Sequence, residues 1–325
     1  MLVFLRGPGP VLRAPFRFFG TIAATLVAGM AVPVMGQALA DAAASEPAAE
    51  APAPAPLPEG SVGGMGDINL YPKRVVISDR ERTASIGLYN RADTAGEYEM
   101  VIGDMAMRED GQVVALAALT DPAERARVKT ASALLKWSPH RIDLPASEAL
   151  MVRIMARIPP GLPQGEYRAH FTVISVPPQG DATSIEQATG EATGGGMSVQ
   201  IRPRFGITIP VIVRIGETTL TAGIADIAPA RLADGGPALR LRITREGTRS
   251  AFGDIAVTAP GAKKPIAEMK GVGVYTEIAG RSVLVPIDPK ADPASYARGA
   301  KLTITYTDDD FAPGKVLARQ DYVVP

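Results

Sequence analysis

The chain has 325 residues, enough for one large or two ordinary domains. Its 34 basic and 34 acidic side chains cancel, so the charge balance favours neither nucleic acid nor an acidic membrane surface as a partner. Cysteine is absent, which excludes disulfides, thiolate nucleophiles and cysteine metal sites.

The first 40 residues have the pattern of an export signal. Arg6, Arg13 and Arg17 form a positive region before an apolar run at residues 18–36, and residues 38–40 (Ala-Leu-Ala) give the small-x-small pattern of a cleavage site. A retained membrane anchor is the alternative, because the run is nearly long enough to span a bilayer. We expect cleavage after residue 40 and, in a bacterium, a mature protein in the periplasm.

Residues 41–66 follow the signal and consist largely of Ala, Pro, Glu and Gly. With almost no large apolar side chain, such a segment cannot bury a core. We expect a disordered, extended Ala/Pro-rich tether.

From residue 68 onward, alternating and β-branched segments between turn signals predict about seven strands. Asp110-Gly111 is a strong hairpin signal. Residues 117–136 admit a short helix or an irregular loop, and residues 179–196 predict a polar, glycine-rich loop. The predicted strand segments are 68–78, 84–90, 97–109, 137–158 (two strands around Pro145) and 165–178.

Residues 197–214 alternate apolar and polar side chains over an unusual length. Period-two alternation predicts a strand with one buried face, although most strands have about five or six residues. Pro203 points to a sheet edge, where a missing N–H is tolerated. We expect residues 207–213 to pack in a first core, and residues 197–205 to form an edge to which a partner strand can pair.

The remainder of the chain, residues 215–325, again predicts short strands between Gly, Pro and Asp turns. The predicted fold is therefore all-β, with two tandem immunoglobulin-like β-sandwiches. The domain assignment is 1–40 signal peptide, 41–66 tether, 67–214 first sandwich and 215–325 second sandwich. The predicted strands of the second sandwich are 236–247, 252–260, 268–278, 281–289, 300–310 and 316–325.

Three segments together resemble the periplasmic chaperones that assemble pili and fimbriae, a family with two immunoglobulin-like domains. They are residues 68–93, with INLYPKRVVIS followed by a strand ending at an Asn turn, residues 138–178, with "VRI" and "GEYR" strands, and the long strand itself. Their order and spacing carry the resemblance, which covers residues 68–214. The second sandwich matches only in style.

The resemblance implies donor-strand complementation: the chaperone lends apolar side chains of its long strand to a subunit that lacks its last strand. It also implies delivery of that subunit to an outer-membrane usher. The implied partners are therefore pilus or surface-fibre subunits and the usher, with no nucleic acid and no cofactor. The sequence leaves open whether a homodimer caps the free edge. The implied donor residues are Val199, Ile201, Phe205, Ile207 and Ile209.

The resemblance further implies that Arg74 anchors the C-terminal carboxylate of the subunit, because a guanidinium can donate two parallel hydrogen bonds to a carboxylate. Without the resemblance, Arg74 reads as a surface cation on a strand. The second anchor of the family, a lysine, aligns with Pro210, so Arg204 and Arg202 are the candidates here. The family's long-loop branch often carries a disulfide, which this chain lacks.

Other polar groups favour ordinary structural roles. His140 and His170 are interpreted as strand-face histidines rather than zinc ligands, because no compact set of three ligands accompanies them. The acidic run at residues 308–310 lacks the spacing of a calcium loop and is interpreted as a solvated turn. No catalytic pattern accompanies Ser138, so we expect no enzyme. The alternative to a chaperone is an envelope or fibre structural or adhesion protein with immunoglobulin-like domains.

Overall fold

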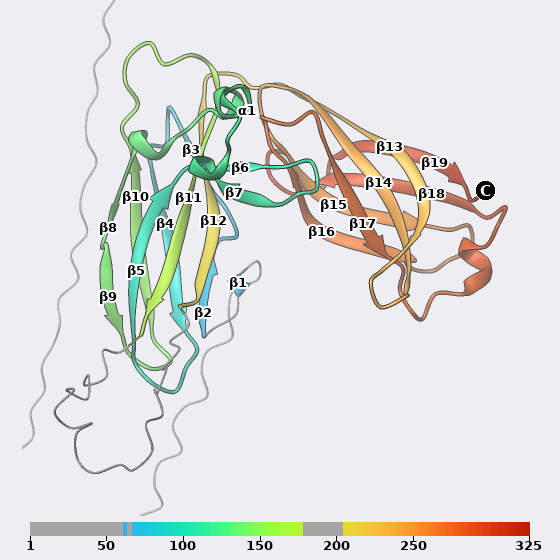
Figure 1. Cartoon of the computed structure of the whole chain (residues 1–325), viewed down its shortest axis with the longest axis horizontal. Helices are drawn as coiled ribbons and strands as arrows, with labels where there is room; N and C mark the ends of the chain where they lie inside the picture. Colours follow the sequence, from blue (N-terminus) through green and yellow to red (C-terminus); the bar gives the residue numbers. More distant parts are fainter. Residues whose placement is uncertain (1–60, 64–66, 178–203) are drawn as a thin grey trace, which may run out of the picture. The chain divides into compact units, whose positions relative to one another are not determined.

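The computed structural model describes residues 61–63, 67–177 and 204–325 (Figure 1). The predictions for the export signal, most of the tether, the polar loop and the first part of the long strand lie outside these residues. Within them, no helix combines the length and hydropathy needed to cross a bilayer.

The first half of the described chain forms two five-stranded sheets that face each other (Figure 1). One sheet contains, in order, β1 (Val62–Gly63), β2 (Ile68–Tyr71), β4 (Thr83–Asn90), β10 (Ala149–Ala156) and β8 (Leu135–Ser138). The other contains β3 (Val75–Ser78), β12 (Gly206–Ile215), β11 (Gly165–Val176), β5 (Gly96–Gly103) and β9 (Arg141–Leu144).

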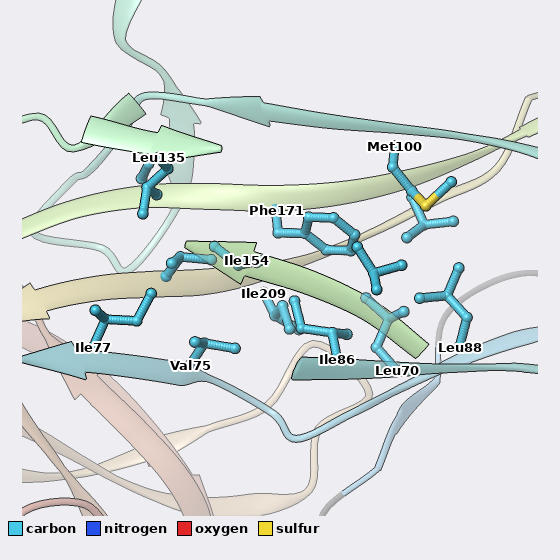
Figure 2. Packing of buried hydrophobic residues seen from close by; sticks show 14 of the residues in the cluster. Leu70, Val75, Ile77, Ile86, Leu88, Met100, Leu135, Ile154, Phe171 and Ile209 are labelled. Carbon is cyan, nitrogen blue, oxygen red and sulfur yellow. The ribbon is translucent and has the colours of Figure 1, made fainter. Parts of the chain in front are cut away.

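The core of this first sandwich lies between the two sheets. Figure 2 shows Ile77, Ile86, Phe171 and Ile209 pointing into one apolar layer, and all four are buried. Burying an apolar side chain of this size contributes about 1.5–3 kcal/mol. The alternation along β10 serves the same core, because its buried and exposed positions follow one another strictly.

The predicted strand at residues 68–78 is two strands in different sheets. β2 pairs with β4 in one sheet, whereas β3 pairs in parallel with β12 in the other. Pro72, which follows a cis peptide bond and has no N–H to donate, lies in the connection between them. The chain therefore passes from one sheet to the other at Pro72–Arg74.

Residues 117–136 contain a short helix, which was one of the two alternatives. α1 (Pro122–Arg127) begins after Asp121, whose side chain accepts a hydrogen bond from the Ala123 N–H. Two 3₁₀ turns flank it, η1 (Leu116–Ala118) and η2 (Ser132–Leu134). The region after it holds β8, β9 and β10, so the prediction of two strands there was wrong by one.

The hairpin predicted at Asp110-Gly111 is present. β6 (Met105–Met107) pairs with β7 (Val113–Ala115) as a separate two-stranded ribbon. Asp110 accepts a hydrogen bond from the Gln112 N–H, and Gly111 has a φ of +87°, a value that favours glycine.

The second half of the chain forms two further sheets around a second core that includes Leu241, Ile255, Ile304 and Tyr306. All six predicted strands are found, so the all-β prediction with two sandwiches is confirmed. The segment containing β13 was missed, because its Gly, Pro and bulge at residues 225–228 break the alternation. The sheets are β13 (Leu220–Arg231), β14 (Pro237–Gly247) and β17 (Gly280–Pro286), and β16 (Ala267–Val274), β15 (Ala251–Thr258), β18 (Lys301–Asp308) and β19 (Val316–Val323), with η3 (Pro293–Tyr296) before β18.

Candidate binding site at the edge of β12

β12 is paired along its whole length on one side and along only part of its length on the other. It pairs with β11 from Gly206 to Ile215, but with β3 only from Val211 to Arg214. Over the described part of the chain, no second strand pairs with residues 206–210. We call this segment, which has a neighbouring strand on one side only, the unpaired part of β12. A half-paired strand of this kind offers backbone groups to which another strand can pair.

The core-facing side of this edge belongs to the chain's own interior. Ile207 and Ile209 are 5% and 1% exposed and pack in the first core. Lending them to a partner would open that core, so Ile207 and Ile209 are not suited to be donor residues. Phe205 is 39% exposed and remains available. The other two predicted donors, Val199 and Ile201, lie outside the described residues.

The opposite face of β12 is covered from Ile212 onward, where the alternation predicted a polar face outside the core. Ile212 is fully buried in a small cluster with Met107, Phe252 and Tyr275. Met107 comes from the β6–β7 hairpin, and the two aromatic residues come from the second sandwich. The alternation in one strand cannot reveal which side chains will cover it, because the covering residues lie far away in the sequence.

Arg74 lies where the unpaired part of β12 ends. β3 begins at Val75, opposite Val211, so Arg74 directly precedes the first residue that pairs with β12. Its Nη1 and Nη2 atoms donate to Asp309 Oδ1 at 2.8 and 2.7 Å. Its guanidinium carbon is 4.3 Å from the ring centroid of Phe252. With only 9% of the side chain exposed, Arg74 is not a surface cation on a strand.

The acidic run that begins at the last residue of β18 is a buried network, so its interpretation as a solvated turn was wrong. Asp308 caps the turn by accepting from the N–H groups of residues 310–312 at 2.7–3.1 Å. Asp309 pairs with Lys73 and Arg74. Asp310 pairs with Arg214 of β12. The cations of the first sandwich are thus matched by acids of the second.

Glu166 of β11 continues this network. Its carboxylate accepts from Arg214 Nε at 3.2 Å and from the hydroxyl of Ser250. Burial is the largest influence on the pKa of Arg214 and lowers it, but the charges of Asp310 and Glu166 outweigh it and leave the pKa raised. Arg214 therefore stays charged between its two carboxylates.

A second buried ion pair joins Arg168 of β11 to Glu277, which lies beyond β16. Arg168 Nη2 donates to both carboxylate oxygens of Glu277 at 2.7 Å, and its guanidinium carbon is 3.6 Å from the ring centroid of Tyr275. Glu277 also accepts from the Met107 N–H at 2.8 Å. The sequence analysis did not single out Glu166, Arg168 or Glu277, because an acid or a base in a strand carries no local sign of its distant partner.

A pocket of about 230 Å³ lies beside Pro210, the last residue of the unpaired part of β12. Lys73, Arg74 and Arg281 are the charged residues of its lining, and Phe252 and Tyr275 supply aromatic rings. Among the residues that the structure describes, no carboxylate lines it. Three cations without an acid in the wall give the pocket a positive lining of the kind that suits an anion. Arg281 comes from β17, and the sequence analysis did not assign it a role.

Arg204, another predicted anchor, does not line this pocket. Arg204 is exposed and donates to the Ser175 carbonyl at 3.3 Å and to Glu99 Oε2 at 3.1 Å. It precedes Pro210 by six residues, which is about 20 Å along extended chain. Arg202 lies outside the described residues.

The two histidines lie apart. His140 is exposed, with its ring centroid 4.6 Å from that of Trp137. His170 is buried in β11, where its Nε2 atom is 3.4 Å from the Tyr275 hydroxyl. Burial, reinforced by the charge of Arg168, lowers the pKa of His170 to about 3. Among the residues that the structure describes, no group of three potential ligands is placed to hold a metal ion.

Comparison with known proteins gave matches to solved structures only; no family model and no curated protein matches the chain. The YadV chaperone is 13% identical with a TM-score of 0.40, over 79% of this chain and 100% of that chain. The E. coli chaperone DraB is 13% identical with a TM-score of 0.39, over 79% and 96%. A Salmonella enterica complex of the SafA pilin with the SafB chaperone contains a chain that is 12% identical, with a TM-score of 0.39, over 81% and 99%.

Proposed function

We propose that this protein is a periplasmic chaperone that binds unfinished pilus or surface-fibre subunits by donor-strand complementation and delivers them to an outer-membrane usher. One observation carries the proposal: the unpaired part of β12 ends at Pro210, and Pro210 lines the cationic pocket that contains Arg74. A partner strand that pairs along this edge brings its chain end to a site suited to a carboxylate.

In strand addition, the backbone and the side chains make different contributions to binding. Main-chain hydrogen bonds along the edge give affinity, and alternate side chains that enter the partner give specificity. Phe205 is the donor residue nearest the paired part of β12, and Val199 and Ile201 continue the same alternation. Ile207 and Ile209 stay in the chaperone's own core and hold the edge in place.

The contact with Asp309 fixes the guanidinium group of Arg74 at the wall of the pocket. Both terminal nitrogens of Arg74 use one carboxylate oxygen, Asp309 Oδ1, and Phe252 supports the guanidinium plane. A subunit carboxylate that enters the pocket adds a charge-assisted partner to this cluster. Binding requires no cofactor.

The proposed compartment rests on the export signal, with cleavage after residue 40. The alternative function is that of an envelope or fibre component that uses the same folds for adhesion. Such a subunit needs its own free donor segment, and residues 41–66 lack the alternating apolar side chains of one. The chaperone proposal therefore accounts for more of the chain.

The test is co-purification from the periplasm with candidate fibre subunits encoded beside this chain. The variants Ile201→Asp and Phe205→Asp place a charge on the donor strand, and Arg74→Ala removes a pocket cation. Met151→Asp is the matched control, because Met151 is 62% exposed on β10, in the other sheet.

We expect subunit to co-purify with the wild type and the Met151 variant and to be lost from the three others, with each variant still folded by circular dichroism. Subunit retained by both donor-strand variants, or absent from a wild type that elutes as a monomer, would move the function to the envelope component. A wild type that elutes as a dimer without subunit would show that a second copy covers the edge.

A further inference from the structure

The three cations of the pocket differ in what balances their charge. Lys73 and Arg74 share the carboxylate of Asp309. Arg281 has no carboxylate within ion-pair distance over the residues that the structure describes; its one hydrogen bond is from Nη1 to the Gly273 carbonyl, at 3.0 Å. The pocket therefore contains one guanidinium whose charge is uncompensated.

Arg281 also carries a donor without an acceptor. Its Nε atom is buried and makes no hydrogen bond. Buried guanidinium N–H groups are ordinarily paired, because leaving one without a partner costs free energy. An anion in the pocket would balance the charge of Arg281.

The β6–β7 hairpin holds Arg281 in this position. Gly111, at the tip of the hairpin, lies against the guanidinium so closely that a Cβ at this glycine would be 2.1 Å from Arg281 Nε. The next residue of β17, Ser282, donates its N–H to the Glu109 carbonyl at 2.8 Å. Arg281 is thus fixed between the hairpin and Gly273 and cannot swing freely into solvent.

We propose that Arg281 is an anchor for the carboxylate of a bound polypeptide and acts from the second sandwich while Lys73 and Arg74 act from the first. The inference rests on the proposed function, because Pro210 joins this pocket to the edge at which a partner strand would pair. A carboxylate is planar and accepts two parallel hydrogen bonds, which suits a guanidinium. The source is a chain terminus or an acidic side chain.

The experiment compares three short synthetic peptides of alternating apolar and polar residues: one with a free C-terminal carboxylate, one with a C-terminal amide, and one amide with aspartate as its last residue. Affinity for the full-length protein is measured by fluorescence polarisation. We expect the wild type to bind the acid about tenfold more tightly than the plain amide, which corresponds to one guanidinium–carboxylate contact. The aspartate peptide shows whether a side-chain carboxylate serves as well.

Arg281→Ala is expected to abolish the preference for the acid and leave the affinity for the plain amide unchanged. Arg281→Lys retains the charge but not the paired donors, so it should keep part of the preference. Gly111→Ala displaces the guanidinium without removing it and should reduce the preference too. Arg319→Ala, at an exposed arginine of β19, is the control and should bind as the wild type does.

A preference for the acid that survives in Arg281→Ala would overturn the anchor while leaving strand donation intact. If the wild type bound none of the three peptides, strand donation itself would fail. In that case, the backbone-independent probe N-acetylglycine decides on Arg281. It should shift the Arg281 Nε–H signal in NMR spectra saturably, and N-acetylglycinamide should not; the absence of any shift would overturn the anchor as well.

Discussion

The carboxylate of Glu277 connects three parts of the molecule through hydrogen bonds. It accepts two hydrogen bonds from Arg168 of the first sandwich and one from the backbone of Met107 in the hairpin, while belonging itself to the second sandwich. Removing one partner of a buried ion pair leaves the other charge without compensation in a weakly polar environment. The network is therefore sensitive to loss of single members.

Glu277→Ala is expected to lower the free energy of unfolding by about 3–5 kcal/mol. The matched control is Glu109→Ala, which removes a carboxylate that pairs with Arg242 but is 61% exposed. That loss should be within about 1 kcal/mol, because water screens the pair. Denaturant unfolding of both variants measures the difference, and similar losses would contradict the role assigned to Glu277.

His170 gives a pH dependence whose sign follows from its lowered pKa. The folded state keeps the imidazole neutral down to about pH 3, whereas the unfolded chain takes up the proton near pH 6.5. Its stabilising contribution is complete above pH 6.5 and is lost as the pH falls from there towards 3, by at most roughly 1.4 kcal/mol per pH unit. Arg168 and Tyr275 are the charged and titratable groups that face it.

His170→Asn should therefore flatten the dependence of unfolding free energy on pH between 6.5 and 4.5, relative to the wild type. His140→Asn removes the exposed histidine and serves as the control for losing one imidazole. Chemical denaturation over a pH series provides the measurement. A slope that changes equally in both variants would refute the assignment to the buried ring.

At the scale of the element, β12 shows how far a local pattern can be trusted. Alternation correctly predicted the core-facing side of residues 207–213, because the strand period alone decides which side chains share a face. It failed at Ile212 and Arg214, since what covers them comes from a hairpin and a second sandwich. The place of Arg281 in the pocket could not be predicted for the same reason, because only folding brings it beside Arg74.

Ile209→Ala is expected to lower the free energy of unfolding by about 2–5 kcal/mol, through lost burial and the cavity left behind. The adjacent Thr208→Ala changes the exposed face of the same strand and should lower it by no more than about 1 kcal/mol. Denaturant midpoints at equal slope give the comparison. Equal costs at both positions would mean that Ile209 does not belong to the core.

At the scale of the whole molecule, two separate cores are joined by buried ion pairs and by the small apolar cluster around Ile212. Arg74, Arg168 and Arg214 of the first sandwich each pair with an acid of the second. Buried pairs of this kind depend on each other, since the loss of an acid leaves its buried cation with less compensating charge. We expect the two sandwiches to unfold together.

Calorimetry of the wild type should therefore give one cooperative transition. Asp310→Ala removes the carboxylate of the second sandwich that pairs with Arg214 and should separate the transition into two, with the midpoint of at least one lowered. Asp321→Ala, at an exposed position of β19, is the control and should keep a single transition. Two transitions already present in the wild type would contradict the coupling.

The short parallel pairing of β3 with β12 has a further consequence for the register in which a partner strand could pair with β12. From Val211 onward, the place beside β12 is occupied by β3, so a strand added along residues 206–210 must stop before Val75. The end of the added chain, rather than its amino-acid sequence, then determines its register. Partner strands with different side chains would then all pair in the same register, as long as each one ends beside the start of β3.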